Sequence, residues 1–149
     1  IEALHECYGV TVVEIGIQSP LNRPDSSLYR NLCGQCSILE SAELIRRALL
    51  FVGVDSGPAH VANAVGTFGV ILLGDYLRFR NYTPYSGAYV DGSGAVLLRA
   101  HGEAATIKPA EVLEVIDNSR ILVAAREGIP QGTTGLDLEM PISPDLTYE

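Results

Sequence analysis

This sequence has little positive charge, few cysteines and no long hydrophobic run. None of its apolar stretches approaches the ~20 residues that a membrane-spanning helix needs. Its net charge of −8 argues against general nucleic-acid binding, which requires a basic surface. The first residues are acidic and lack an apolar core, so we expect no signal peptide.

Three cysteines, Cys7, Cys33 and Cys36, form an odd set, and the last two are spaced as C-x-x-C. That spacing is typical of redox sites and of half a zinc site. The sequence offers no second ligand pair, and Cys36 directly precedes a helix that Ser37 and Glu40 are placed to cap. We therefore expect reduced thiols in a cytoplasmic protein and no metal site. A redox-active protein remains an open alternative.

Strands and helices alternate along the chain. Residues 1–8 indicate the end of a helix, and β-branched residues over Val10–Ile15 predict a strand. A short strand is expected near Tyr29–Cys33, and Ala95–Arg99 is expected to be the last one. Such alternation favours a parallel sheet with helices on both faces.

The connecting segments are less regular. In the expected helix Ile38–Leu49, four apolar side chains recur at helical spacing and should face the sheet. They are Leu39, Ala42, Ile45 and Leu49. Residues 75–94 are expected to be a long loop, and Pro109 should open a helix to about Ile116. That helix could resume as far as Arg126.

The most informative segment is residues 51–74. An apolar run over Leu50–Val54 predicts a buried strand, which ends at Asp55 and Ser56. Gly57 follows, and a glycine lets the backbone come close to a ligand.

A helix is predicted next, over Pro58–Val65. A proline in the first turn loses no intrahelical hydrogen bond, and Gly66 favours a left-handed end. Val70–Leu73 predicts the following strand. The backbone N–H groups of residues 59–61 and the positive end of the helix dipole would face an anion. Because open α/β sheets bind ligands at strand carboxyl ends, we predict a phosphate-bearing ligand here.

His60, in the first turn of this helix, is placed to point toward the same crevice. The alternative is structural, with Asp55 and Ser56 as helix caps and His60 as a half-buried side chain. Spacing alone leaves both interpretations open. Arg78 and Arg80 are the nearest candidate cations for a phosphate, or else solvated loop charges.

A serine hydrolase is unsupported on mechanistic grounds. The D-S-G-P run at residues 55–58 is similar to the nucleophile segment of trypsin-like proteases, which need an upstream His and Asp in an all-β double barrel. His5 is the single histidine before this run, and helical patterns surround the run. Gly53 and Ser56 also lack the spacing of a G-x-S-x-G nucleophile elbow.

Residues 55–66 read DSGPAHVANAVG. This run resembles the D-[ST]-G-x-x-H-x-A-x-x-x-G signature of the heptosyltransferase-like glycosyltransferases of family 9. Residues 31–49 resemble an upstream loop and helix of that family. Downstream, Gly74, residues 84–85 and residues 107–116 resemble later family segments.

The resemblance implies a Rossmann-like parallel sheet with helices on both faces, which is half of a GT-B fold. Residues 1–127 would be the nucleotide-sugar-binding domain without its first strand, and residues 128–149 an extended or frayed tail. The acceptor domain would be absent. The implied function is the donor-binding half of a transferase that moves a sugar from a nucleotide-diphosphate sugar to a glycolipid or polysaccharide acceptor.

The family pattern also implies which residues bind the donor. They are Asp55, Ser56, Gly57, Pro58 and His60. The family works without a metal or other cofactor, and its catalytic base lies in the other domain. The resemblance therefore implies no catalytic residue in this chain, no activity of the chain alone, and membrane contact only through the acceptor.

Two positions qualify this expectation. Where the family usually carries Lys-Thr, this chain has Gln35 and Cys36, which removes a possible cation beside the phosphate. The alternative is therefore a degenerate, non-catalytic nucleotide-binding or interaction module. Glu14, at the end of a predicted strand, is a further candidate on the ribose side.

Overall fold

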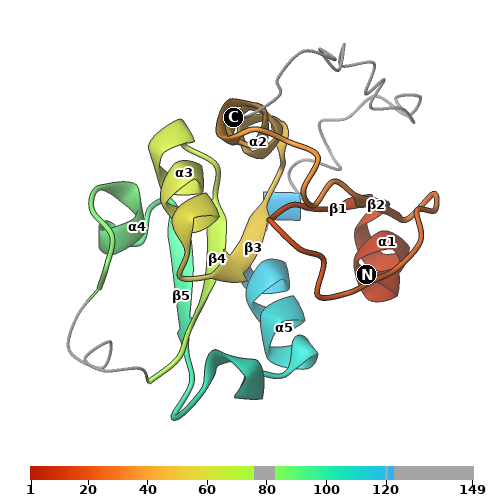
Figure 1. The fold of residues 1–149 in the computed structure, drawn as a ribbon. Coiled ribbons are helices and arrows are strands. Elements are labelled where there is room, and N and C mark those ends of the chain that lie inside the picture. The colour runs from red at the N-terminus through yellow and green to blue at the C-terminus, as the bar shows by residue number, and fades with distance from the viewer. Residues whose placement is uncertain (76–82, 120, 123–149) are drawn as a thin grey trace.

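The structure is a computed structural model that describes residues 1–75, 83–119 and 121–122. Its elements are α1 (Glu2–Tyr8), β1 (Val12–Glu14), β2 (Tyr29–Asn31), α2 (Ile38–Arg47), β3 (Phe51–Val54), α3 (Gly57–Val65), β4 (Gly69–Leu73), α4 (Ala88–Asp91), β5 (Ala95–Arg99), a 3₁₀ turn (Ala104–Thr106) and α5 (Pro109–Ser119). All strand pairs are parallel, and helices flank the sheets (Figure 1). The expected Rossmann-like α/β fold is confirmed. Arg78, Arg80 and the expected tail lie outside the described residues.

The strands form two sheets, which corrects the expectation of one. β1 pairs with β2, placing Val12 opposite Tyr29, while the other sheet has the order β3-β4-β5. The expected strand Val10–Ile15 is only three residues long in the structure and does not pair with β3.

The first face of the larger sheet is covered by α2 and α3. Side chains alternate between the faces of a strand, so Ile71 and Leu73 of β4 point the same way. Both are fully buried with Ala59 and Ala62 of α3 and with Ile45 of α2. Small alanines let the helix lie close to the strands, which fixes the start of α3 relative to the strand ends.

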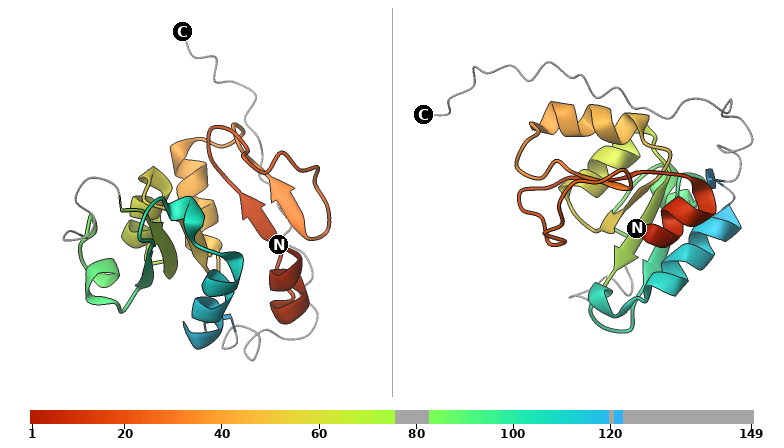
Figure 2. Two further views of the ribbon diagram at one scale, coloured as in Figure 1. Left: turned by 90° about the horizontal axis from the view of Figure 1, so that it is seen from below. Right: turned by 90° about the vertical axis from the view of Figure 1, so that its right-hand side faces the viewer.

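The second face is covered by α5. Val70 of β4 is fully buried there against Ile116, and Leu122 completes this cluster. α1 lies beside α5 in both views of Figure 2, and the Tyr8 hydroxyl donates a hydrogen bond to Asp117. Helices therefore lie on both faces of the sheet. Within the described ranges, no helix is long and apolar enough to cross a membrane.

Helix α2 confirms its predicted cap but not its predicted buried face. Ser37 accepts from the Glu40 N–H, and the Glu40 side chain accepts from the Ser37 N–H. Ile45 is 3% exposed, as expected, whereas Leu39 is 82% exposed, and Leu49 lies beyond the helix and is 43% exposed. The reason is that α2 enters the core near its carboxyl end, so its first turn has no apolar layer beneath it.

The segment expected to be a loop over residues 75–94 contains the short helix α4. Its Tyr89 is 1% exposed and donates a hydrogen bond to the Thr67 carbonyl at 2.7 Å. The ring lies directly on Gly69, where a Cβ atom would come within 2.5 Å of the Tyr89 hydroxyl oxygen. Burial of this aromatic ring explains why a Tyr-, Gly- and Ser-rich stretch folds onto the sheet.

Candidate functional site

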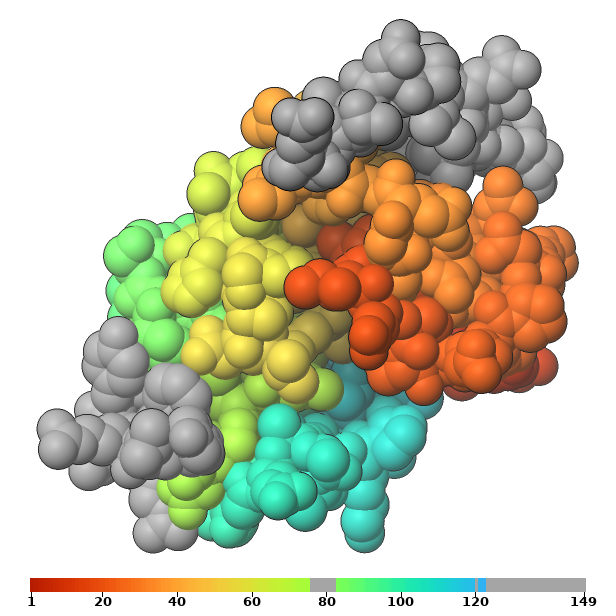
Figure 3. Space-filling model, in the orientation of Figure 1, coloured from red at the N-terminus to blue at the C-terminus, as the bar shows by residue number. Residues whose placement is uncertain are grey.

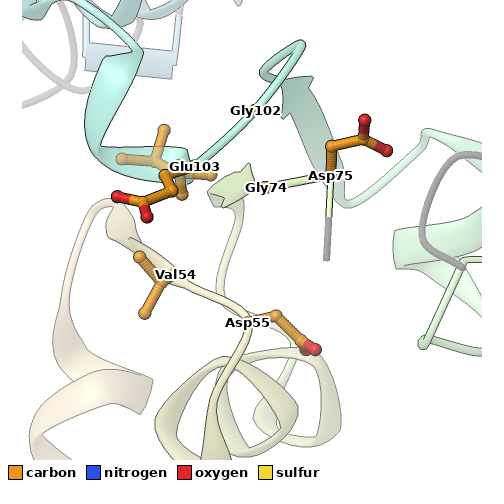
Figure 4. A pocket seen from close by; sticks show the side chains of 8 residues that line it. Val54, Asp55, Gly74, Asp75, Gly102 and Glu103 are labelled. Atoms are coloured by element: carbon orange, nitrogen blue, oxygen red, sulfur yellow. The ribbon is translucent and has the colours of Figure 1, made fainter. Parts of the chain in front are cut away.

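The predicted turn lies at the carboxyl end of β3, directly before α3. α3 ends at Gly66 in the left-handed conformation, with φ of 79°, as expected. A pocket of about 540 Å³ opens at the carboxyl ends of β3 and β4 and beside the chain that follows β5 (Figure 4). It is lined by Val54, Asp55, Leu72, Gly74, Asp75, Gly102, Glu103 and Ala104. This is the edge at which α/β sheets bind ligands.

Carboxylates dominate the polar lining of this pocket. Asp55 follows β3, Asp75 follows β4 and Glu103 follows β5, and no described lining residue carries a positive charge. Figure 4 shows Glu103 beside Val54, whereas the side chains of Asp55 and Asp75 point away from Glu103. Carboxylate oxygens accept hydrogen bonds only, so the pocket suits a hydroxyl-rich group better than a phosphate.

Asp55 and His60 come together, as the motif predicted, and Tyr85 joins them. The Tyr85 hydroxyl donates to Asp55 Oδ1 at 2.7 Å, and His60 Nε2 lies 3.7 Å from the same oxygen. The imidazole and phenol rings are 4.8 Å apart between centroids. Burial, and next the hydrogen bond to Asp55, raises the pKa of Tyr85, so this phenol stays protonated.

The remaining predicted residues form the turn itself. Ser56 is the N-cap of α3, but its hydroxyl donates back to the Val54 carbonyl at 3.0 Å and caps no helical N–H. Gly57 begins the helix, and no heavy atom lies within 4 Å of the place where its Cβ would be. Ser56, Gly57, Pro58 and His60 are not among the residues that line the pocket. Ser56 therefore holds the N-cap position that the structural alternative expects, although its side chain makes no capping hydrogen bond.

The expectation that residues 59–61 leave their N–H groups unpaired is also wrong for two of them. The N–H groups of Ala59 and His60 both donate to the Ser56 carbonyl, at 3.1 and 3.2 Å. Pro58 has no N–H. An anion at the start of α3 would therefore meet the N–H groups of Ser56 and Gly57, which precede the expected residues 59–61.

Glu14, the candidate on the ribose side, is held by Tyr29 of β2 and by Ser19 between the two strands. Its Oε2 accepts from the Ser19 hydroxyl at 2.5 Å and from the Tyr29 hydroxyl. Although burial opposes the effect, the hydrogen bonds from Ser19 and Tyr29 lower the pKa of Glu14. These contacts give Glu14 a structural role at the end of β1.

The cysteine pair shows no sign of activation. Burial, as the largest cause, raises the pKa of both Cys33 and Cys36, whereas a reactive thiol needs a lowered one. Gln35, between them, donates its side-chain amide to the Asn31 carbonyl at 2.8 Å. Among the described residues, no three His, Cys, Asp or Glu side chains gather so as to hold a metal ion.

Sequence reasoning missed the role of Tyr85. This tyrosine follows Asp55 by 30 residues and lies in a stretch expected to be a loop. No local periodicity could place it at the site. The signal was its position at residues 84–85, where the resemblance to the glycosyltransferases continues.

The fold and the strand-end pocket define a Rossmann-like α/β unit, and comparisons with known proteins show which family it resembles. Residues 18–88 match glycosyltransferase family 9, the heptosyltransferase family. The chain is also 31% identical, over 109 residues, to lipopolysaccharide heptosyltransferase 3 of Escherichia coli; the alignment covers 72% of this chain and 31% of that protein. No solved structure matches significantly. The chain is thus heptosyltransferase-like, and its resemblance to family 9 is confirmed.

Proposed function

We propose that this chain is the donor-binding half of a glycosyltransferase and binds a nucleotide-diphosphate sugar at the ends of β3, β4 and β5. One observation carries this proposal: Asp55 lines the pocket and is followed by Ser56, the N-cap of α3. A nucleotide-diphosphate sugar carries hydroxyls, which suit the carboxylate-lined pocket, and a diphosphate, which suits the amino end of α3. The match to family 9 supports sugar transfer as the activity of the whole protein.

In this proposal the sugar occupies the carboxylate-lined pocket. Its hydroxyls donate to Asp55 and to Glu103, which approaches from the chain after β5. Hydrogen bonds to charged acceptors are stronger than neutral ones, so a few suffice to orient a sugar. His60, whose side chain is 53% exposed, stands beside Asp55 to meet the phosphate.

The diphosphate lies at the amino end of α3, at the N–H groups of Ser56 and Gly57. The helix dipole contributes roughly 0.3–1 kcal/mol there, and preorganised dipoles stabilise charge that develops on a leaving diphosphate. This arrangement offsets the acidic character of the pocket. We propose that binding needs no metal or other cofactor.

Transfer itself would require the acceptor domain. The chain spans 31% of the length of its relative, so the activity of the whole protein is part of the proposal. We propose a cytoplasmic enzyme of lipopolysaccharide assembly that touches a membrane only through its acceptor. The purified 149-residue chain should show no sugar transfer, because positioning of an acceptor and a general base are both missing. Measurable turnover by this chain would contradict that division of roles.

Calorimetry with ADP-glucose, UDP-glucose and GDP-mannose tests donor binding, after a thermal-shift screen with the same compounds. Asp55→Ala should weaken binding of the best ligand far more than it lowers stability. Gly57→Val should block the close approach of a diphosphate, while Gly57→Ala should do so less. Glu114→Ala removes an exposed carboxylate on α5 and is the matched control. Equal affinity in the parent chain, Asp55→Ala and Gly57→Val would contradict the proposed site.

A degenerate, non-catalytic module is the second candidate, and the loop before α2 favours it. Gln35 holds its own loop through Asn31, and Cys36 is a neutral thiol rather than a cation. Restoring the family pattern with Gln35→Lys and Cys36→Thr separates the candidates. A donor-binding domain should gain affinity for nucleotide sugars, whereas a module that no longer binds them should show no heat of binding before or after the change.

A further inference from the structure

We propose that Tyr85 is a positioning residue that fixes the Asp55 carboxylate, and with it His60, for donor binding. This inference rests on the proposed function and adds a residue that lies outside the D-S-G-P-A-H motif. Its basis is a set of contacts that converge on one oxygen atom. The Tyr85 hydroxyl and His60 Nε2 both approach Asp55 Oδ1, at 2.7 and 3.7 Å.

The orientation of the carboxylate follows from these contacts. Since both use Oδ1, Oδ2 is the oxygen that a ligand hydroxyl in the pocket would reach. The Asp55 side chain is 22% exposed, so it is sheltered yet accessible from the pocket that it lines. A protonated phenol can only donate to the carboxylate, and it therefore selects one rotamer without competing for the ligand.

The ring of Tyr85 also limits where His60 can lie. The two ring centroids are 4.8 Å apart with an interplanar angle of 39°. The His60 side chain is 53% exposed, and the phenol ring of Tyr85 packs against its imidazole. An exposed histidine would otherwise sample several rotamers, and each would place its nitrogen atoms differently relative to Asp55.

Tyr85 can serve this role because it is itself anchored in the core. It is 7% exposed, and its ring meets the ring of Tyr89 edge to face at 5.5 Å. Tyr89 is in turn fixed by its hydrogen bond to Thr67 and by its close fit on Gly69. The Asp55 carboxylate is thus connected to the rigid β4 region through two aromatic rings.

A second contact fixes the backbone next to Tyr85. The Asn63 side-chain amide of α3 donates to the Ser86 carbonyl at 2.9 Å. The segment that carries Tyr85 is therefore attached to the same helix whose amino end would hold the diphosphate. Supporting contacts of this kind hold a binding group within the narrow range of geometry that function requires.

The test compares Tyr85→Phe with Tyr89→Phe. Both changes remove one buried hydroxyl and keep the ring, but only the first removes the hydrogen bond to Asp55. NMR of the Asp55 carboxyl ¹³C signal in the ligand-free 149-residue chain reports that bond directly. Calorimetry with ADP-glucose, UDP-glucose and GDP-mannose reports donor affinity.

We expect Tyr85→Phe to move the Asp55 carboxyl signal and to weaken binding of the best of the three ligands by about ten-fold, the effect of losing a hydrogen bond to a charged group. Tyr89→Phe keeps the ring that packs against Tyr85, so it should lower thermal stability and should change the Asp55 signal and the affinity far less than Tyr85→Phe does. An unmoved Asp55 signal, or unchanged affinity in Tyr85→Phe while the parent binds, would overturn the positioning role. If the parent binds none of the three, the proposed function fails instead, and the carboxyl signal alone decides whether Tyr85 fixes Asp55.

Discussion

The three-stranded sheet and the two-stranded sheet are stabilised in different ways. In β3-β4-β5, the side chains of Val70, Ile71 and Leu73 are fully buried between helices on both faces. In β1-β2, Tyr29 is the one described residue that is fully buried, and its hydroxyl serves the Glu14 carboxylate. Figure 3 shows the N-terminal segment, in red and orange, on the right-hand side of the molecule. One sheet is built on apolar burial and the other on a polar cluster.

The difference between the two sheets affects how exactly each can hold the side chains of a binding site. The pocket and the Asp55 cluster lie on the strand ends of the apolar unit, where packing fixes each backbone position. Sites on such elements hold their side chains more exactly than sites on loosely packed ones. The corresponding edge of the smaller sheet carries Glu14, whose acceptor capacity is directed to Ser19 and Tyr29.

The largest expected effect is in the apolar unit. Ile71→Ala removes a fully buried side chain at the centre of β4 and should lower the free energy of unfolding by about 3 kcal/mol. Urea denaturation followed by circular dichroism measures this loss. Ile71→Val is the matched control, with an expected loss of about 1 kcal/mol. A small effect of Ile71→Ala would mean that this core is looser than its burial indicates.

The fold of this unit could be predicted well from sequence. The apolar runs over residues 50–54 and 70–73 and the helix-ending Gly66 are local signals, and the structure confirms a strand in each run and the helix end. The expected burial of the first run is wrong, because Val52 and Val54 of β3 are 41% and 50% exposed. The division into two sheets could not be predicted, because pairing of distant strands leaves no local periodicity. The strand expected over Val10–Ile15 has the right residue types for a sheet, but its ladder partner is β2 alone.

The next effect is in the polar unit. Tyr29→Phe removes one of the two side-chain donors to Glu14 and should lower stability at pH 7 by less than Ile71→Ala does. The change should also weaken the acid sensitivity of the protein. Glu14 has a folded-state pKa below its ordinary value of 4.5, so its contribution is present above that pH and is lost as the pH falls through the lowered pKa.

Urea midpoints of the parent chain and Tyr29→Phe, measured between pH 7 and pH 3, check this expectation. The difference between the two proteins should be largest at pH 7 and should shrink toward the acid end, because a protonated Glu14 no longer favours either donor. A difference that stays constant as the pH falls would show that Tyr29 acts independently of the ionised Glu14 carboxylate. Ser19→Ala should repeat the pattern through the other donor.

A smaller effect is expected at the start of α2. Ser37→Ala removes the side chain that accepts from the Glu40 N–H and should cost about 1 kcal/mol in the free energy of unfolding. Ser41→Ala, inside the same helix, is the matched control, because it changes the same residue type without touching the cap. Equal losses in the two variants would contradict a capping role. Chemical denaturation of both proteins decides.

The candidate site was only partly predictable. Asp55 and His60 are five residues apart at a strand–helix junction, so local geometry brings them together. Tyr85 reaches them through burial of Tyr89 on Gly69, a tertiary contact that depends on the whole sheet. The pairing of the Ala59 and His60 N–H groups was also not predicted, because both donate to the Ser56 carbonyl in the first turn of α3.

The smallest expected effect lies at the first turn of α2. Leu39 and Ile45 belong to the same predicted apolar stripe, yet Leu39 is 82% exposed and Ile45 is 3% exposed. Leu39→Ala should therefore change the free energy of unfolding by less than about 0.5 kcal/mol, since exposed substitutions away from special contacts are nearly neutral. Ile45→Ala is the matched control and should cost several times more, because it leaves a cavity between α2 and α3. If Leu39→Ala proves as destabilising as Ile45→Ala, the Leu39 side chain is covered in solution, and the apolar core around α2 extends beyond Ile45 to the first turn of the helix.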